Sequence, residues 1–129
     1  GMLVADELAL PYAYVRPKPK DHGMKNQIEG ELPAGSKVVV VEDLISTGGS
    51  SLKAVAALRE AGFEVVGMVA SYTYGFPVAE EAFREANVKL VTLTDYEHVV
   101  EKALETGYIK ESEVSMLHDW RKDPANWRK

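Results

Sequence analysis

Runs of apolar residues alternate along the chain with segments of helical spacing, and this alternation is the first guide to the fold. The β-branched run at residues 38–41 predicts a strand buried on both faces, because a strand with one exposed face would show alternating polar residues. Residues 65–72 and 88–93 predict two further buried strands, and residues 12–16 predict a short one. The alternation within residues 26–32 predicts a short strand at the sheet edge.

Segments in which apolar residues recur at helical spacing lie before, between and after these strands. The predicted helices cover residues 3–8, 51–61, 78–86, 96–104 and 112–120. The buried face of the second helix is expected to consist of Leu52, Val55, Ala56 and Leu58. Because strands and helices alternate with short links, the pattern predicts a parallel α/β sheet with right-handed crossovers.

Length and composition indicate one domain with a core of its own. The chain has 129 residues, of which 46% are hydrophobic. No apolar run approaches the roughly 20 residues of a membrane span, and no cysteine is present to form disulfides or thiolate metal sites. We therefore expect a cytoplasmic protein that does not bind membranes. The net charge of −5 argues against general nucleic-acid binding, which requires clustered Lys and Arg.

The segment after the β-branched run has the composition of a phosphate-binding loop. Two acids, Glu42 and Asp43, end the strand, and the small residues 46–50 lead into the next predicted helix. Free backbone N–H groups and the positive end of the helix dipole converge at such a junction, and glycines let an anion approach closely. Ligands of open α/β sheets bind beyond the carboxyl ends of the strands, so this loop is the expected site. The Walker and G-x-G-x-x-G patterns are both absent.

The acidic pair narrows the kind of phosphate ligand. Carboxylates at Glu42 and Asp43 would repel a polyphosphate beside them, so they are expected to accept hydrogen bonds from sugar hydroxyls or to help hold a cation. The alternative is that the two acids are only a solvated strand end and a helix cap.

Two motifs carry a resemblance to a known family. Residues 38–50, VVVVEDLISTGGS, resemble the ribose-phosphate motif of type I phosphoribosyltransferases. Residues 14–23, YVRPKPKDHG, are similar to the strand and mobile catalytic loop of the orotate phosphoribosyltransferase family, and the resemblance extends through Tyr108. It implies a three-layer α/β fold around a mostly parallel, Rossmann-like sheet. It also implies transfer of a phosphoribosyl group from 5-phosphoribosyl 1-diphosphate to orotate, which gives orotidine 5′-monophosphate and diphosphate in pyrimidine synthesis.

The resemblance also assigns roles to individual residues. Glu42 and Asp43 would contact the 2′ and 3′ hydroxyls of 5-phosphoribosyl 1-diphosphate, with Mg²⁺ bridging diphosphate and ribose oxygens and Asp43 as its candidate protein ligand. The 5′-phosphate would lie in a cradle formed by Ser46, Thr47, Gly48, Gly49 and Ser50. Arg16, Lys20 and His22 match the cations that the family places over the leaving diphosphate, where negative charge develops. His22 would also donate a proton or a hydrogen bond to that group.

The sequence departs from the family pattern in three places. Pro17 stands where many members have a loop lysine, so Lys18 either takes over that substrate contact or the contact is absent. The strand ending at Tyr74 lacks the arginine that many members direct at the orotate carboxylate. The N-terminal hood and the first core strand of the family have no counterpart, so we expect an N-terminally truncated core of weak or no activity. The missing strand would lie between the strands at residues 12–16 and 38–43.

The expected organisation is therefore a partial core domain over residues 1–129, with a mobile catalytic loop at residues 17–35 and an irregular tail at residues 121–129. Because the family's loop closes over the neighbouring subunit, a homodimer or a strand-exchanged oligomer is expected. Two other functions stay open: a non-catalytic regulator that binds a phosphoribosyl ligand, and a phosphoribosyltransferase for another nucleobase. Within the loop, the lysines also fit a solvated charge run. At the end of the strand at residues 65–72, Tyr72 and Tyr74 fit either a wall for the base or ordinary packing.

Overall fold

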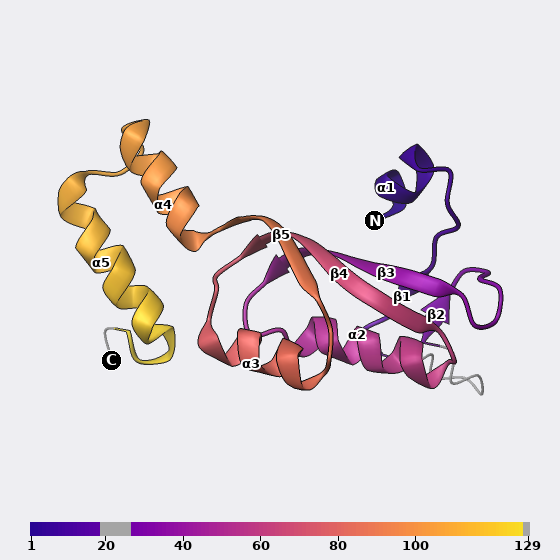
Figure 1. Cartoon of the computed structure of the whole chain (residues 1–129). Helices are drawn as coiled ribbons and strands as arrows, with labels where there is room; N and C mark the ends of the chain where they lie inside the picture. Colours follow the sequence, from indigo (N-terminus) through magenta and orange to yellow (C-terminus); the bar gives the residue numbers. More distant parts are fainter. Residues whose placement is uncertain (19–26, 128–129) are drawn as a thin grey trace.

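The structure is a computed structural model and describes residues 1–18 and 27–127. Its centre is a parallel sheet of three strands in the order β3 (Lys37–Ile45), β4 (Glu64–Thr73) and β5 (Leu90–Asp95). Helices α2 (Gly49–Glu60) and α3 (Pro77–Glu85) are the crossovers between these strands, and both lie on one face of the sheet (Figure 1). The predicted α/β class with a parallel sheet is confirmed.

The core lies between the sheet and these two helices. Its most deeply buried side chains are Ile45, Val55 and Met68, each at most 1% exposed, and Phe83 of α3 packs against them. These residues come from β3, α2, β4 and α3, so the core joins every element that surrounds the end of β3. The position of that strand end is therefore fixed by packing.

One face of α2 differs from the prediction. The buried residues are Ser51, Val55 and Leu58, whereas Ala56 is exposed. Positions 51, 55 and 58 are spaced four and three residues apart and so lie on one face of a helix. The polar Ser51 therefore occupies a core position that the apolar pattern alone assigned elsewhere.

Strand β3 is half buried, and the prediction that residues 38–41 are buried on both faces is wrong. Val39 is 54% exposed, while Val38 and Val40 on the alternate positions are partly buried. Val41 is in register with Val69 and Val91 on the neighbouring strands, and these three are 39%, 37% and 49% exposed. The reason is that α2 and α3 both cover the opposite face. A β-branched run indicates a strand but does not show whether a second layer covers it.

The N-terminal part of the chain contains a second, smaller sheet. Helix α1 (Met2–Glu7) is followed by β1 (Tyr14–Val15) and β2 (Ile28–Glu29), which pair antiparallel as a two-stranded sheet. The short strands predicted at residues 12–16 and 26–32 are present. Within the described residues β3 has β4 as its one strand partner, so its outer edge is open.

Two helices and a short turn complete the chain. Helix α4 (Tyr96–Glu105) and helix α5 (Glu111–Lys122) stand beyond the carboxyl ends of the strands (Figure 1), and η1 (Pro124–Asn126) is a 3₁₀ turn. Both helices were predicted. Helix α5 continues two residues into the segment at 121–129 that was expected to be irregular, since the first residue that cannot continue a helix is Pro124. No helix of the described residues has the length and apolar character to cross a membrane.

Candidate functional site

The candidate site is the loop between β3 and α2. Strand β3 ends at the fully buried Ile45, and α2 begins at Gly49, with Gly48 as its N-cap at φ +82°. A Cβ on Gly48 would lie 2.8 Å from the ring of Phe83, so the backbone passes too close to α3 for any side chain. The loop is therefore held in place by a core aromatic residue.

This loop leaves the start of α2 available to an anion. No side chain caps α2, although the first N–H groups of a helix have no partner within it. The neighbouring residues Ser46, Thr47, Gly49 and Ser50 are exposed, and Gly48 is buried. The structure thus brings the five residues predicted to cradle a phosphate together at one helix N-terminus, where the dipole favours negative charge.

The two acids at the end of β3 have different surroundings. Asp43 is exposed, and its Oδ1 accepts a hydrogen bond from the backbone N–H of Leu44 at 2.7 Å. Glu42 is partly buried, and its Oε2 accepts a hydrogen bond from the Ser51 hydroxyl at 2.9 Å. The other oxygen of Glu42, Oε1, accepts a hydrogen bond from the Asp43 N–H at 3.2 Å.

Ser51 is a site residue that sequence reasoning missed. It is 2% exposed, and its single hydroxyl contacts the acid that the ribose motif singles out. The available signal was its spacing from Val55 and Leu58, which places it on the buried face of α2. A buried polar side chain on that face needs a hydrogen-bond partner, and Glu42 supplies it.

Of the basic residues predicted to contact the diphosphate, the structure describes Arg16 and Lys18. Arg16 follows β1, and its guanidinium pairs with Glu29 at 3.2 Å, where both side chains are 38% exposed. The Gln27 amide donates to the Arg16 carbonyl oxygen at 2.8 Å. These polar contacts of Arg16 are therefore made with β2 and the residue before it, and not with the loop between β3 and α2. Lys18 is exposed. Lys20 and His22 lie outside the described residues, as does the rest of the segment at 19–26 of the expected catalytic loop.

The carboxylates of the site suit a cation that a substrate helps to hold. In the described part of the chain, no group of three or more His, Asp or Glu side chains is arranged to bind a metal ion. Mg²⁺ commonly takes only one or two carboxylates and completes its shell with phosphate oxygens and water. The exposed carboxylate of Asp43 fits that requirement.

A cavity of about 580 Å³ lies at the carboxyl ends of β4 and β5. Its walls are mostly aromatic and are formed by Tyr72, Tyr74, Tyr96, Met116, Leu117, Trp120 and Trp127. Tyr74 is central to this aromatic cluster, with its ring centroid 5.2 Å from that of Phe76 and 5.6 Å from that of Trp120. Burial, followed by the neighbouring Tyr74, raises the pKa of Tyr72 to about 12.

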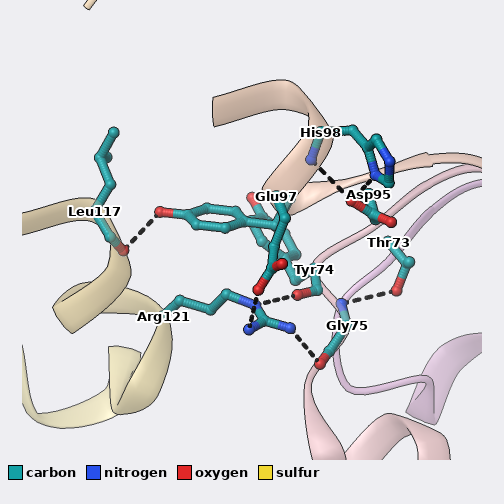
Figure 2. Close-up of polar contacts among 9 residues, drawn as sticks. Thr73, Tyr74, Gly75, Asp95, Glu97, His98, Leu117 and Arg121 are labelled. Carbon is teal, nitrogen blue, oxygen red and sulfur yellow. Dashed lines mark hydrogen bonds and ion pairs between the residues drawn. The ribbon is translucent and has the colours of Figure 1, made fainter. Parts of the chain in front are cut away.

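Arg121 fastens α5 to this region (Figure 2). Its Nε donates to the Tyr74 carbonyl oxygen and its Nη2 to that of Gly75, both at 2.9 Å. On the same helix, the Leu117 carbonyl oxygen accepts a hydrogen bond from the Tyr96 hydroxyl at 2.8 Å. No local pattern indicates these contacts, because Arg121 lies in the segment expected to be irregular and its partners are 46 and 47 residues away.

The nearby start of α4 is capped by a pair of titratable residues. Asp95 accepts hydrogen bonds from the His98 backbone N–H at 3.0 Å and stands 2.8 Å from the His98 ring nitrogen Nδ1 (Figure 2). The backbone hydrogen bond and then the ring lower the pKa of Asp95, and the hydrogen bond to Asp95 raises the pKa of His98. The capping bond accounts for this pair as part of the helix start.

Comparison with known proteins gives consistent matches. The phosphoribosyl transferase domain matches residues 1–106. Orotate phosphoribosyltransferase of Bacteroides thetaiotaomicron is 70% identical over 127 residues, which are 98% of this chain and 60% of that protein. The same enzyme of Cytophaga hutchinsonii is 54% identical over 129 residues, or 62% of its length. The chain thus spans about 60% of the length of these curated relatives.

Solved structures agree with the fold. The crystal structure of orotate phosphoribosyltransferase from Aeropyrum pernix has a TM-score of 0.72 and 33% identity, and the match covers 84% of this chain and 59% of that one. UMP synthase of Leishmania donovani has a TM-score of 0.79 at 23% identity, covering 94% of this chain and 26% of that one. The second likeness concerns the fold alone.

Proposed function

Because the chain belongs to the phosphoribosyl transferase domain family, we propose that it is part of an orotate phosphoribosyltransferase. Such an enzyme transfers the phosphoribosyl group of 5-phosphoribosyl 1-diphosphate to orotate. The observation that carries the proposal is the loop after β3, which connects two acids to the uncapped start of α2. Phe83 leaves no room in this loop for a side chain at Gly48. The identity of 70% to the Bacteroides thetaiotaomicron enzyme supports orotate as the acceptor.

In this proposal the loop binds the sugar phosphate. The 5′-phosphate accepts hydrogen bonds from the backbone of residues 46–50, and the helix dipole of α2 stabilises its charge. Glu42 and Asp43 accept hydrogen bonds from the ribose hydroxyls and so fix the orientation of the ring. The ligand is thus held at its 5′-phosphate and at its two ribose hydroxyls. C1 of the sugar takes part in neither contact and remains accessible for the reaction.

The reaction itself separates charge. As the bond from C1 to the diphosphate breaks, positive charge develops on the sugar and negative charge on the leaving group, so cations near the diphosphate lower the barrier. Arg16, Lys18, Lys20 and His22 are the residues proposed for that role. Mg²⁺, when bound, would neutralise part of the charge on the diphosphate, and Asp43 offers a carboxylate to hold it. The proposal also includes a homodimer, the cytoplasm as compartment and a place in pyrimidine synthesis.

The first experiment tests ligand binding, because the chain spans about 60% of its relatives' length. We expect calorimetry to show binding of 5-phosphoribosyl 1-diphosphate with Mg²⁺, followed by binding of orotate to that complex. Asp43→Ala removes an exposed carboxylate and should weaken the first step about tenfold or more, as expected for a lost hydrogen bond to a charged group.

Asp119→Ala is the matched control, since Asp119 is an exposed aspartate on α5 that pairs with Lys122. It should bind like the unaltered chain. Equal binding by Asp43→Ala and Asp119→Ala would refute the assigned site. Failure of orotate to bind, with the first step intact, would point to a different acceptor.

A further inference from the structure

Ser51 is set apart from the other hydroxyl residues of the loop region by burial. Ser46, Thr47 and Ser50 are exposed and available to a ligand, whereas Ser51 is 2% exposed and faces the core with Val55 and Leu58. It is the one buried polar or charged residue within the described parts of the chain. A hydroxyl in that position has no access to water and depends on a protein partner.

That partner is the Glu42 carboxylate. The Ser51 hydroxyl donates to Oε2 at 2.9 Å, while the Asp43 backbone N–H donates to Oε1 at 3.2 Å. Both oxygens of Glu42 are therefore held by donors of this chain. Since an ionised carboxylate has about four acceptor sites, each oxygen keeps a lone pair for a further donor.

The two acids therefore differ in freedom. Asp43 is exposed and accepts one backbone hydrogen bond from its own neighbour, Leu44. Glu42 has a longer side chain with more rotatable bonds, and without a partner it would lose more rotamer entropy on binding a ligand. A fixed carboxylate avoids most of that loss, because its orientation is set before the ligand arrives.

We propose that Ser51 is a positioning residue for ribose recognition, whose buried hydroxyl holds the Glu42 carboxylate in the orientation that accepts hydrogen bonds from the sugar hydroxyls. The inference rests on the proposed function, since it requires a ribose at Glu42. Ser51 does not touch the ligand itself. Its contribution is confined to ligands that carry the sugar and is absent for phosphate alone.

The test compares two ligands in each variant by calorimetry. Ribose 5-phosphate engages both the loop and the acids, whereas inorganic phosphate engages the loop alone. Ser51→Ala should weaken binding of ribose 5-phosphate about twofold to tenfold, because the freed Glu42 side chain must then be immobilised when the ligand binds. The affinity for inorganic phosphate should not change. Alanine is smaller than serine and favours helix, so α2 is expected to stay intact.

A double-mutant cycle with Glu42→Gln separates positioning from damage to the fold. If Ser51 acts through Glu42, adding Ser51→Ala to Glu42→Gln should cost little further affinity for ribose 5-phosphate. Ser115→Ala changes an exposed serine of α5 and serves as the matched control for the substitution itself.

Three results would overturn the inference. Unchanged affinity of Ser51→Ala for ribose 5-phosphate would show that the hydroxyl has no role, and an equal loss for both ligands would show a purely structural one. An unaltered chain that binds inorganic phosphate but not ribose 5-phosphate would refute the proposed function first, and the role of Ser51 with it.

Discussion

At Gly48 the absence of a side chain decides whether the phosphate loop can take its shape. The residue has φ +82°, a conformation that side chains disfavour, and it lies against Phe83, which is 4% exposed. Gly62 has a similar φ of +88°, but no atom lies within 4 Å of the place its Cβ would take. Both glycines therefore have a positive φ that disfavours a side chain, but only at Gly48 would a side chain also collide with a neighbouring residue.

We expect Gly48→Ala to lower the free energy of unfolding by about 2 to 4 kcal/mol, as the sum of left-handed strain and overpacking. Gly62→Ala should cost only the strain, about 1 to 2 kcal/mol. Urea unfolding of both variants measures the difference. Equal losses would show that Phe83 does not constrain the loop, and Phe83→Leu should recover part of the Gly48→Ala loss if it does.

Among the elements, α5 depends most on contacts far away in the sequence. Its Arg121 side chain is 29% exposed and donates to two backbone carbonyl groups, those of Tyr74 and Gly75, at the end of β4. The guanidinium carbon also lies 5.9 Å from the centre of the Tyr96 ring. These contacts orient the helix across the aromatic cavity, so they decide where the C-terminal part of the chain sits.

Arg121→Ala should lower the free energy of unfolding by about 2 kcal/mol, because two partly buried charged hydrogen bonds are lost together. Arg121→Lys should recover little of this, since a single ammonium group lacks the planar fork that reaches both carbonyl groups. Lys122→Ala is the control, as Lys122 is exposed and pairs with Asp119 on the same helix. If Arg121→Ala were as stable as Lys122→Ala in urea unfolding, the hydrogen bonds of Arg121 to Tyr74 and Gly75 would not contribute to stability.

At the scale of the whole molecule, the sheet has one covered face and one apolar face that is largely exposed. Leu93 is 86% exposed and Val66 55%, in addition to the valines in register on the three strands. The outer edge of the nine-residue strand β3 is open within the described residues. An open edge beside an apolar face is a template for pairing with another chain.

We therefore expect the chain to self-associate through β3 of two copies, which would pair edge to edge and satisfy the open backbone groups of that strand. Val41→Lys should shift the mass measured by light scattering toward a single chain, because a lysine at a strand edge opposes such pairing. Val99→Lys is the control, since Val99 is 44% exposed but lies on α4. A single-chain mass for the unaltered protein would contradict this expectation.

Local sequence patterns predicted the helices, the strands and the phosphate loop. The predictions were wrong or incomplete where a residue's burial or contacts depend on segments distant in the sequence. The run at residues 38–41 predicted a strand, but its burial depends on which layers lie above and below it. The phosphate loop was found because its residue types are contiguous. Ser51 was missed because its role depends on Glu42 across the strand-to-helix junction, and Arg121 because both of its carbonyl partners lie at the end of β4.

The way in which α5 is attached also has a consequence for motion over time. The helix is held mainly by Arg121 and by the aromatic side chains around Tyr74, while the hydrogen bonds of the sheet do not involve it. Segments with few anchoring contacts open locally at a lower free energy than the core. Amide hydrogens of α5 should thus exchange with solvent earlier than those of β4, so the wall that α5 contributes to the aromatic cavity should open more often than the wall formed by β4.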